Sequence, residues 1–325
     1  MARTEWTHDQ LVDGVASGDR RALARAISLV ENRDPQAAAI VRELYPRTGK
    51  AYAVGVTGPP GVGKSSLIAA LVRAERERGR SVGVISVDPS SPFSHGALLG
   101  DRIRLVDHFL DPEVFIRSMG TRGHLGGLAE ATLQALVLLD AAGKDVVFLE
   151  TVGTGQSEVE VIRIADTTLL VLMPGSGDSV QALKAGIMEV PDAIAINKMD
   201  HPGAKAMLTD VRSMLALDQR PDRGPQVPVL LTDAVRGEGV PALVEALDAR
   251  LAGLRTGGEL ERRRGANLAA EVFTLASSRA RTHLEESVAD DDDLRHVLER
   301  VERRELDPLS AVDEILRRVF RITDG

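Results

Sequence analysis

The run Gly58-Pro59-Pro60-Gly61-Val62-Gly63-Lys64-Ser65 decides the fold of this chain. It directly follows an apolar segment, 51–57, with the pattern of a buried strand, and the residues after it have helical spacing. Its three glycines let backbone amides turn toward a phosphate where a Cβ would collide, and the helix N-terminus adds positive charge. Strand, glycine loop and helix in this order predict a phosphate-binding P-loop. In such a loop Lys64 reaches the β- and γ-phosphates, and the Ser65 hydroxyl binds Mg²⁺.

Beyond this loop, short apolar strands alternate with amphipathic helices. We expect strands at 51–57, 81–87, 114–118, 146–149, 168–172, 193–196 and 227–231, and helices at 64–78, 125–142, 204–217 and 239–252. Several of the strands are continuous apolar runs, which is typical of a parallel sheet covered on both faces. The alternation predicts an α/β fold of the P-loop NTPase class, a doubly wound and mostly parallel sheet.

Helical segments flank this α/β part. Residues 8–46 have apolar positions at helical spacing, and residues 259–325 are helical and heavily charged. In the latter, Asp290–Asp293 lies between two helices and Asp307-Pro308 begins the last one. Since 256–258 breaks the pattern, we expect an N-terminal helical arm (1–48), a P-loop domain (49–255) and a C-terminal helical extension (256–325).

The composition restricts the partners and the compartment. The chain has 325 residues, is 43% hydrophobic and 27% charged, and carries a formal net charge of −8 without any cysteine. The negative charge argues against nucleic acid or an anionic membrane as the main partner. The lack of cysteine excludes a disulfide scaffold and thiolate metal sites. Because the sequence shows neither a signal-peptide core nor an apolar run of membrane-spanning length, we expect a cytoplasmic protein.

Two short motifs at strand ends indicate which nucleotide binds. Asn197-Lys198-Met199-Asp200 follows the strand at 193–196, at the carboxyl edge where open α/β sheets bind ligands. An aspartate there can accept hydrogen bonds from N1–H and the 2-amino group of guanine. Adenine lacks this pair of donors, so Asp200 favours GTP over ATP, and Lys198 is expected to pack along the base. Thr232-Asp233-Ala234 ends the next strand, placed to contact guanine from the other side, although GTPases usually have Ser-Ala there.

Acidic residues at other strand ends are candidates for the catalytic and metal site. Glu150 closes the strand at 146–149, where such an acid orients Mg²⁺, and the Gly153 amide is placed to sense the γ-phosphate. Position 154 is Thr, where small GTPases often carry a water-orienting Gln, and Gln156 lies two positions later. We therefore expect slow intrinsic hydrolysis, with a partner able to complete the catalytic group.

Asp88 and Asp101 are further candidates for the metal shell. Asp88 closes the strand at 81–87, and Asp101 lies in the segment that follows it. Either aspartate could instead cap a helix or close a turn, which are common roles for this residue type.

Five sequence blocks resemble the MeaB/ArgK/MMAA family of GTPases: Val87–Phe93, Gly100–Arg104, Thr121–Gly127, Glu150–Glu158 and Pro174–Asp178. The resemblance covers almost the whole chain. It implies a G-protein chaperone of adenosylcobalamin-dependent acyl-CoA mutases, typically methylmalonyl-CoA mutase, that gates cofactor delivery and protects the mutase. It further implies a homodimer formed through the C-terminal helices. The same resemblance places Asp88, Asp101 and Glu150 around Mg²⁺ and makes Gly175–Lys184 a switch that signals to the mutase.

The expected site therefore consists of four groups of residues. The catalytic residues are Lys64, Glu150, Gly153 and Gln156, the metal ligands are Ser65, Asp88, Asp101 and Glu150, and the switch residues are Asp178 and Lys184. The GTP or GDP contacts are Gly58, Pro59, Pro60, Gly61, Val62, Gly63, Lys64, Ser65, Ser66, Asn197, Lys198, Asp200, Asp233, Ala234 and Val235.

Three other functions stay open at this point. A transport-linked ATPase or kinase would need adenine selectivity, which Asp200 opposes. A nickel-delivery GTPase would need a Cys/His metal site, and the chain has no Cys and seven scattered His. A structural dimer with an inactive nucleotide site is disfavoured because Lys64, Ser65, Glu150 and Asp200 are all present. The client also stays open among the mutases of methylmalonyl-, isobutyryl- and hydroxyisobutyryl-CoA.

Overall fold

A parallel sheet forms the centre of the α/β part of the chain. The computed structural model describes residues 6–88, 108–120, 125–151, 163–175, 191–217 and 227–320. In these ranges seven strands lie in the order β3-β2-β4-β1-β5-β6-β7, and each neighbouring pair is parallel. The strands are β1 (Tyr52–Thr57), β2 (Val82–Asp88), β3 (Val114–Gly120), β4 (Val146–Thr151), β5 (Thr167–Leu172), β6 (Ala193–Ile196) and β7 (Val229–Leu231). The predicted α/β fold with a doubly wound parallel sheet is confirmed.

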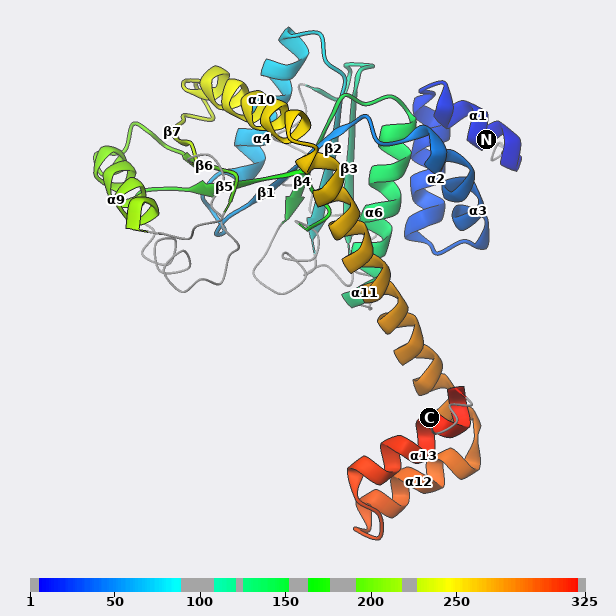
Figure 1. Cartoon of the computed structure of the whole chain (residues 1–325). Helices are drawn as coiled ribbons and strands as arrows, with labels where there is room; N and C mark the ends of the chain where they lie inside the picture. Colours follow the sequence, from blue (N-terminus) through cyan, green and yellow to red (C-terminus); the bar gives the residue numbers. More distant parts are fainter. Residues whose placement is uncertain are drawn as a thin grey trace. The chain divides into compact units, whose positions relative to one another are not determined.

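Helices cover both faces of this sheet (Figure 1). The helices α4 (Lys64–Glu77) and α10 (Val240–Thr256) pack on one face, and α6 (Leu125–Ala141) and α9 (Ala204–Leu217) pack on the other. In β4, Val146 and Phe148 join the core under α4 and α10, whereas Val147 and Leu149 join the core with α6. Since successive strand residues point to opposite faces, a strand covered on both sides must be apolar throughout. This explains the continuous apolar runs of the sequence.

Three N-terminal helices pack together beside α6 (Figure 1). They are α1 (His8–Ala16), α2 (Arg20–Glu31) and α3 (Pro35–Leu44), and the short 3₁₀ helix η1 (Tyr45–Arg47) follows them. Each of the three begins after a residue whose side chain accepts a hydrogen bond from the first turn: Thr7, Asp19 and Asp34. Their apolar faces share one core with α6 and with residues of β2, β3 and β4. Residues of the expected arm 1–48 are thus packed into the same core as the sheet.

The described chain ends in three helices, α11 (Glu259–Asp290), α12 (Asp292–Glu302) and α13 (Pro308–Phe320). The breaks between them lie at Asp291, whose side chain caps α12, and before Pro308. The chain divides into two compact units, Met1–Leu268 and Ala269–Gly325, so the division lies within α11, whereas the expected boundary at 256 coincides with the end of α10. In the second unit α12 packs against α13. None of the described helices is long and apolar enough to cross a bilayer.

Two buried carboxylates fix the beginning of α11 to the sheet. Asp166 accepts two hydrogen bonds of 2.6 Å from the Arg264 guanidinium. Asp192 accepts hydrogen bonds from Arg263 at 2.9 Å and from Arg250 at 3.0 Å. Asp166 directly precedes β5, and Asp192 directly precedes β6. Arg263 and Arg264 therefore hold the first turns of α11 at the amino edge of both strands, and Arg250 joins α10 to the same place.

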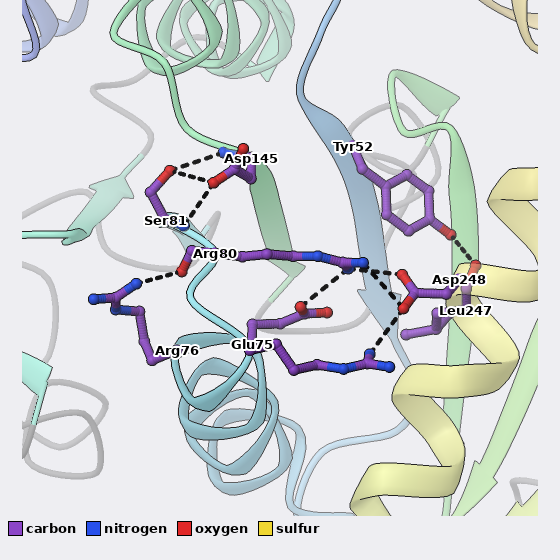
Figure 2. Close-up of polar contacts among 9 residues, drawn as sticks. Tyr52, Glu75, Arg76, Arg80, Ser81, Asp145, Leu247 and Asp248 are labelled. Carbon is purple, nitrogen blue, oxygen red and sulfur yellow. Dashed lines mark hydrogen bonds and ion pairs between the residues drawn. The ribbon is translucent and has the colours of Figure 1, made fainter.

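A second polar cluster joins the end of α4 to α10 (Figure 2). Arg80 donates to the two oxygens of Asp248 at 2.7 and 3.1 Å and to buried Glu75 at 3.1 Å. Burial raises the pKa of Glu75 above its ordinary value, against the opposing effect of the Arg80 charge. Beside them, the Tyr52 hydroxyl of β1 donates to the Leu247 carbonyl at 3.2 Å. The bonds of Arg80 fix the carboxyl end of α4, and the P-loop leads into the amino end of the same helix.

Candidate nucleotide-binding site

The P-loop lies at the carboxyl end of β1, the central strand between β4 and β5. Two of its glycines are required by their surroundings. Gly58 has φ +145°, and a Cβ on it would lie 2.1 Å from the Val171 carbonyl oxygen of β5. Gly63 has φ +95°, and a Cβ there would lie 2.5 Å from the side-chain amide nitrogen of Asn197. Side chains at either position would displace the loop, so its course depends on glycine.

Lys64 begins α4 and folds back over the loop. It is 7% exposed, and its ammonium donates to the carbonyls of Gly58 at 2.6 Å and Pro59 at 3.2 Å. A buried cation at a helix N-terminus is unfavourable unless oxygens surround it, because the helix end is itself positive. The loop therefore holds a cation in a place suited to an anionic ligand.

Glu150 lies under the same loop, between two hydroxyl groups. It belongs to β4, not to the loop after it, and is 1% exposed. Ser65 donates to its Oε1 at 2.5 Å, and Ser86 of β2 donates to its Oε2 at 3.0 Å. A hydroxyl and a carboxylate next to each other are the oxygen donors that Mg²⁺ prefers, so these residues fit the expected ion. Ser86 was not expected from the sequence; its signal was a polar residue within the apolar run of β2.

Asp88 lies at the same edge of the sheet. It ends β2, where Val87 is in register with Thr151, the residue after Glu150. The backbone of Asp88 is thus placed near the Ser65–Glu150 pair, while its side chain lies outside the described part of the chain. Five further expected residues lie wholly outside the described part of the chain: Asp101, Gly153, Gln156, Asp178 and Lys184. Within the described residues, no group of three or more His, Asp or Glu side chains forms a metal cluster.

Asn197 connects the P-loop to the segments expected at the base. It is 3% exposed, and its amide nitrogen donates to the Val62 carbonyl at 2.9 Å. Its side-chain oxygen accepts hydrogen bonds from the Ala234 amide at 3.1 Å and from the Thr232 hydroxyl at 3.4 Å. The side chain of Lys198 also bonds to the P-loop, because its ammonium donates to the Gly61 carbonyl at 3.2 Å. One buried amide therefore joins three loops at the carboxyl edge of the sheet.

The two expected base-reading aspartates differ in their surroundings. The Asp200 side chain is 60% exposed, and its Oδ2 lies 3.7 Å from a terminal nitrogen of Arg236. Asp233 is buried, and its carboxylate accepts the amides of Val235 and Arg236, both at 2.9 Å, and the Arg236 Nε at 2.8 Å. Hydrogen bonds from the amide and guanidinium of Arg236 hold the pKa of Asp233 below its usual range. Asp233 thus shapes the turn through its carboxylate, while Asp200 presents its oxygens to solvent.

Comparisons with known proteins show what the chain is similar to. A family model described as "Methylmalonyl Co-A mutase-associated GTPase MeaB" matches residues 23–289. A protein from Pyrococcus abyssi is 46% identical over 316 residues, 96% of this chain and 97% of its own length. The "Methylmalonic aciduria type A homolog, mitochondrial" of Caenorhabditis briggsae is 37% identical over 79% of this chain and 67% of its own. A crystal structure of a "LAO/AO transport system kinase" has a TM-score of 0.74 at 27% identity, with 98% and 99% of the two chains covered.

Proposed function

The chain belongs to the MeaB family of GTPases, and from that premise we propose that it binds GTP with Mg²⁺ and hydrolyses it slowly. We further propose that this cycle controls the loading of adenosylcobalamin into an acyl-CoA mutase. The observation that carries the proposal is the buried amide of Asn197, which joins the phosphate loop to the segment bearing Asp200. A site with a cation and a hydroxyl–carboxylate pair at one end and an accessible aspartate at the other suits a guanine nucleotide.

At the phosphate end, each residue has a distinct role. Lys64 exchanges its bonds to the Gly58 and Pro59 carbonyls for phosphate oxygens when the triphosphate binds. Ser65 and Glu150 hold Mg²⁺, with Asp88 and Asp101 as further ligands. When bound, the ion neutralises charge that develops on the phosphates. The Gly153 amide senses the γ-phosphate and Gln156 orients water, and the Thr at 154 accounts for a slow rate.

At the base end, Asp200 selects guanine. Its exposed carboxylate can accept from N1–H and from the 2-amino group at once, and adenine would leave both oxygens without donors. Lys198 packs along the base, and the turn Asp233–Val235 contacts it from the other side. The kinase named in the similar crystal structure raises a phosphate-transferring ATPase as a second candidate. Competition between GTP and ATP for the site decides between the two, because only the second function requires adenine.

The partner is proposed from the family description and from the C-terminal unit. The family is named for association with methylmalonyl-CoA mutase, and the related Caenorhabditis briggsae protein is named for methylmalonic aciduria. In the second unit, Val272, Phe273, Leu309 and Val312 are exposed, which suits a homodimer formed through these helices. We place the protein in the cytoplasm, with Gly175–Lys184 as the switch toward the mutase.

The test is GTP turnover without a mutase and with each of the candidate mutases of methylmalonyl-, isobutyryl- and hydroxyisobutyryl-CoA. Wild type should be stimulated by one of these mutases, and Asp178→Ala and Lys184→Ala should keep their GTP affinity but lose stimulation, because nucleotide state and mutase binding are thermodynamically coupled. Equal stimulation of all three proteins would remove the switch from the proposal. Without stimulation of wild type by any of the three candidate mutases, the chaperone function would be wrong.

A further inference from the structure

Arg236 lies between the two aspartates of the base end. Its Nε donates to Asp233 at 2.8 Å, and a terminal nitrogen of the same guanidinium lies 3.7 Å from the Oδ2 of Asp200. A third carboxylate, that of Glu238, lies 3.8 Å from the Nε. The three acids come from two different loops, so Arg236 connects the turn after β7 to the loop after β6.

The Asp233 end of this connection is rigid. The Asp233 carboxylate is buried and also accepts two backbone amides of its own turn. The turn is closed further by backbone hydrogen bonds from Gly237 to Asp233 at 2.8 Å and from Asp233 to Glu238 at 2.9 Å. Because a guanidinium is planar, fixing its Nε also limits where its terminal nitrogens can lie. Arg236 is therefore presented to Asp200 from a fixed support.

The Asp200 carboxylate is exposed, so a fixed guanidinium beside it can limit the orientations that it adopts. An exposed carboxylate samples several rotamers, whereas bonding to N1–H and the 2-amino group requires both oxygens in the plane of the base. A separation of 3.7 Å is longer than a hydrogen bond, so the guanidinium attracts the carboxylate without occupying its lone pairs. The attraction favours one orientation and leaves both oxygens available to a base.

We propose that Arg236 is a positioning residue for guanine recognition: anchored on Asp233, it orients the Asp200 carboxylate toward the base. This rests on the proposed binding of a guanine nucleotide. It also accounts for the unusual Asp at 233, where GTPases usually have Ser. A serine could cap the turn through its hydroxyl but would not fix a guanidinium, so the acid at 233 and the arginine at 236 act as a pair.

The experiment measures the affinities of GDP, inosine diphosphate and ADP for the full chain. Inosine diphosphate lacks the 2-amino group, so the ratio of GDP to inosine diphosphate affinity reports how well both oxygens of Asp200 are used. Arg236→Ala should lower the affinity for GDP by about 1.5- to fivefold, the range of an exposed ion pair, and should bring the GDP and inosine diphosphate affinities closer together. Asp233→Ser should do the same, and the double variant should lose no more than either single one. Glu238→Gln, beside the same guanidinium, is the matched control and should leave the ratio unchanged.

The outcomes separate this inference from the function on which it rests. If wild type does not prefer GDP over ADP, the proposed guanine site is wrong. If wild type prefers GDP but Arg236→Ala keeps the ratio of GDP to inosine diphosphate, the positioning role is wrong. Additive losses in the double variant would show that Asp233 is not the anchor of Arg236.

Discussion

Replacing Asn197 with alanine tests the connection between the two ends of the site. The change removes the buried hydrogen bond to the Val62 carbonyl at 2.9 Å and the partly buried one from the Ala234 amide at 3.1 Å. Each backbone group left without a partner costs about 1–3 kcal/mol, so losing two should lower the unfolding free energy of the variant by about 2–6 kcal/mol. Its affinity for GDP should also fall at least about tenfold, because the loops are no longer held together.

Urea unfolding followed by tryptophan fluorescence measures the first effect. Trp6 is the single tryptophan of the chain, and it packs against the core that the N-terminal helices share with the sheet. The matched control is Asn267→Ala, which removes one long bond of 3.4 Å to the Ala165 carbonyl. This control should cost less than about 1 kcal/mol and leave GDP affinity unchanged. If Asn197→Ala matches the control in both measurements, Asn197 does not join the loops.

Three further substitutions test other parts of the structure. Asp200→Asn should lower the affinity for GTP and allow xanthosine triphosphate to bind, changing the difference between their binding free energies by about 2–4 kcal/mol. Unchanged affinities for both nucleotides would show that Asp200 does not read the base. Asp166→Asn should cost about 3 kcal/mol in urea unfolding because it leaves a partly buried arginine without its counter-charge, whereas Arg281→Ala, in an exposed pair on α11, should have no measurable effect. Burial raises the pKa of the Glu75 carboxyl above its ordinary 4.5, so the folded state binds the carboxyl proton more tightly than the unfolded state does. The unfolding free energy therefore falls as pH rises from 4.5 to the raised pKa of the folded state. Glu75→Gln should therefore gain stability relative to wild type as pH increases from 4.5, and a pH-independent difference would contradict this reasoning.

Much of the fold could be predicted because its signals are local. The apolar runs located all seven strands of the described sheet, and the glycine pattern located the P-loop, since positive φ and close approach demand glycine at 58 and 63. The ends of strands were less well located: the strand expected at 146–149 extends to Thr151, so Glu150 is paired within β4. Strand pairing with neighbours extends such ends, and pairing is not a local property.

The roles of individual side chains were harder to predict because they depend on residues distant in the chain. Ser86 meets Glu150 only because β2 and β4 are neighbours in the sheet. Asn197 was expected at the nucleotide, but its described bonds go to Val62, Thr232 and Ala234. The division of the chain into two units could not be predicted either. It lies at Leu268, within the continuous helix α11, where the sequence shows no break in the helix.

Single-turnover hydrolysis of GTP tests the central claim most directly. Wild type and Lys64→Ala would each be mixed with a limiting amount of GTP and Mg²⁺, with ATP as the comparison nucleotide and circular dichroism as the check of folding. Lys64 is the buried cation of the phosphate loop, so its removal should abolish hydrolysis, while wild type should convert GTP slowly and in preference to ATP. Unchanged GTP hydrolysis by a folded Lys64→Ala protein would contradict the assignment of this loop as the GTPase site.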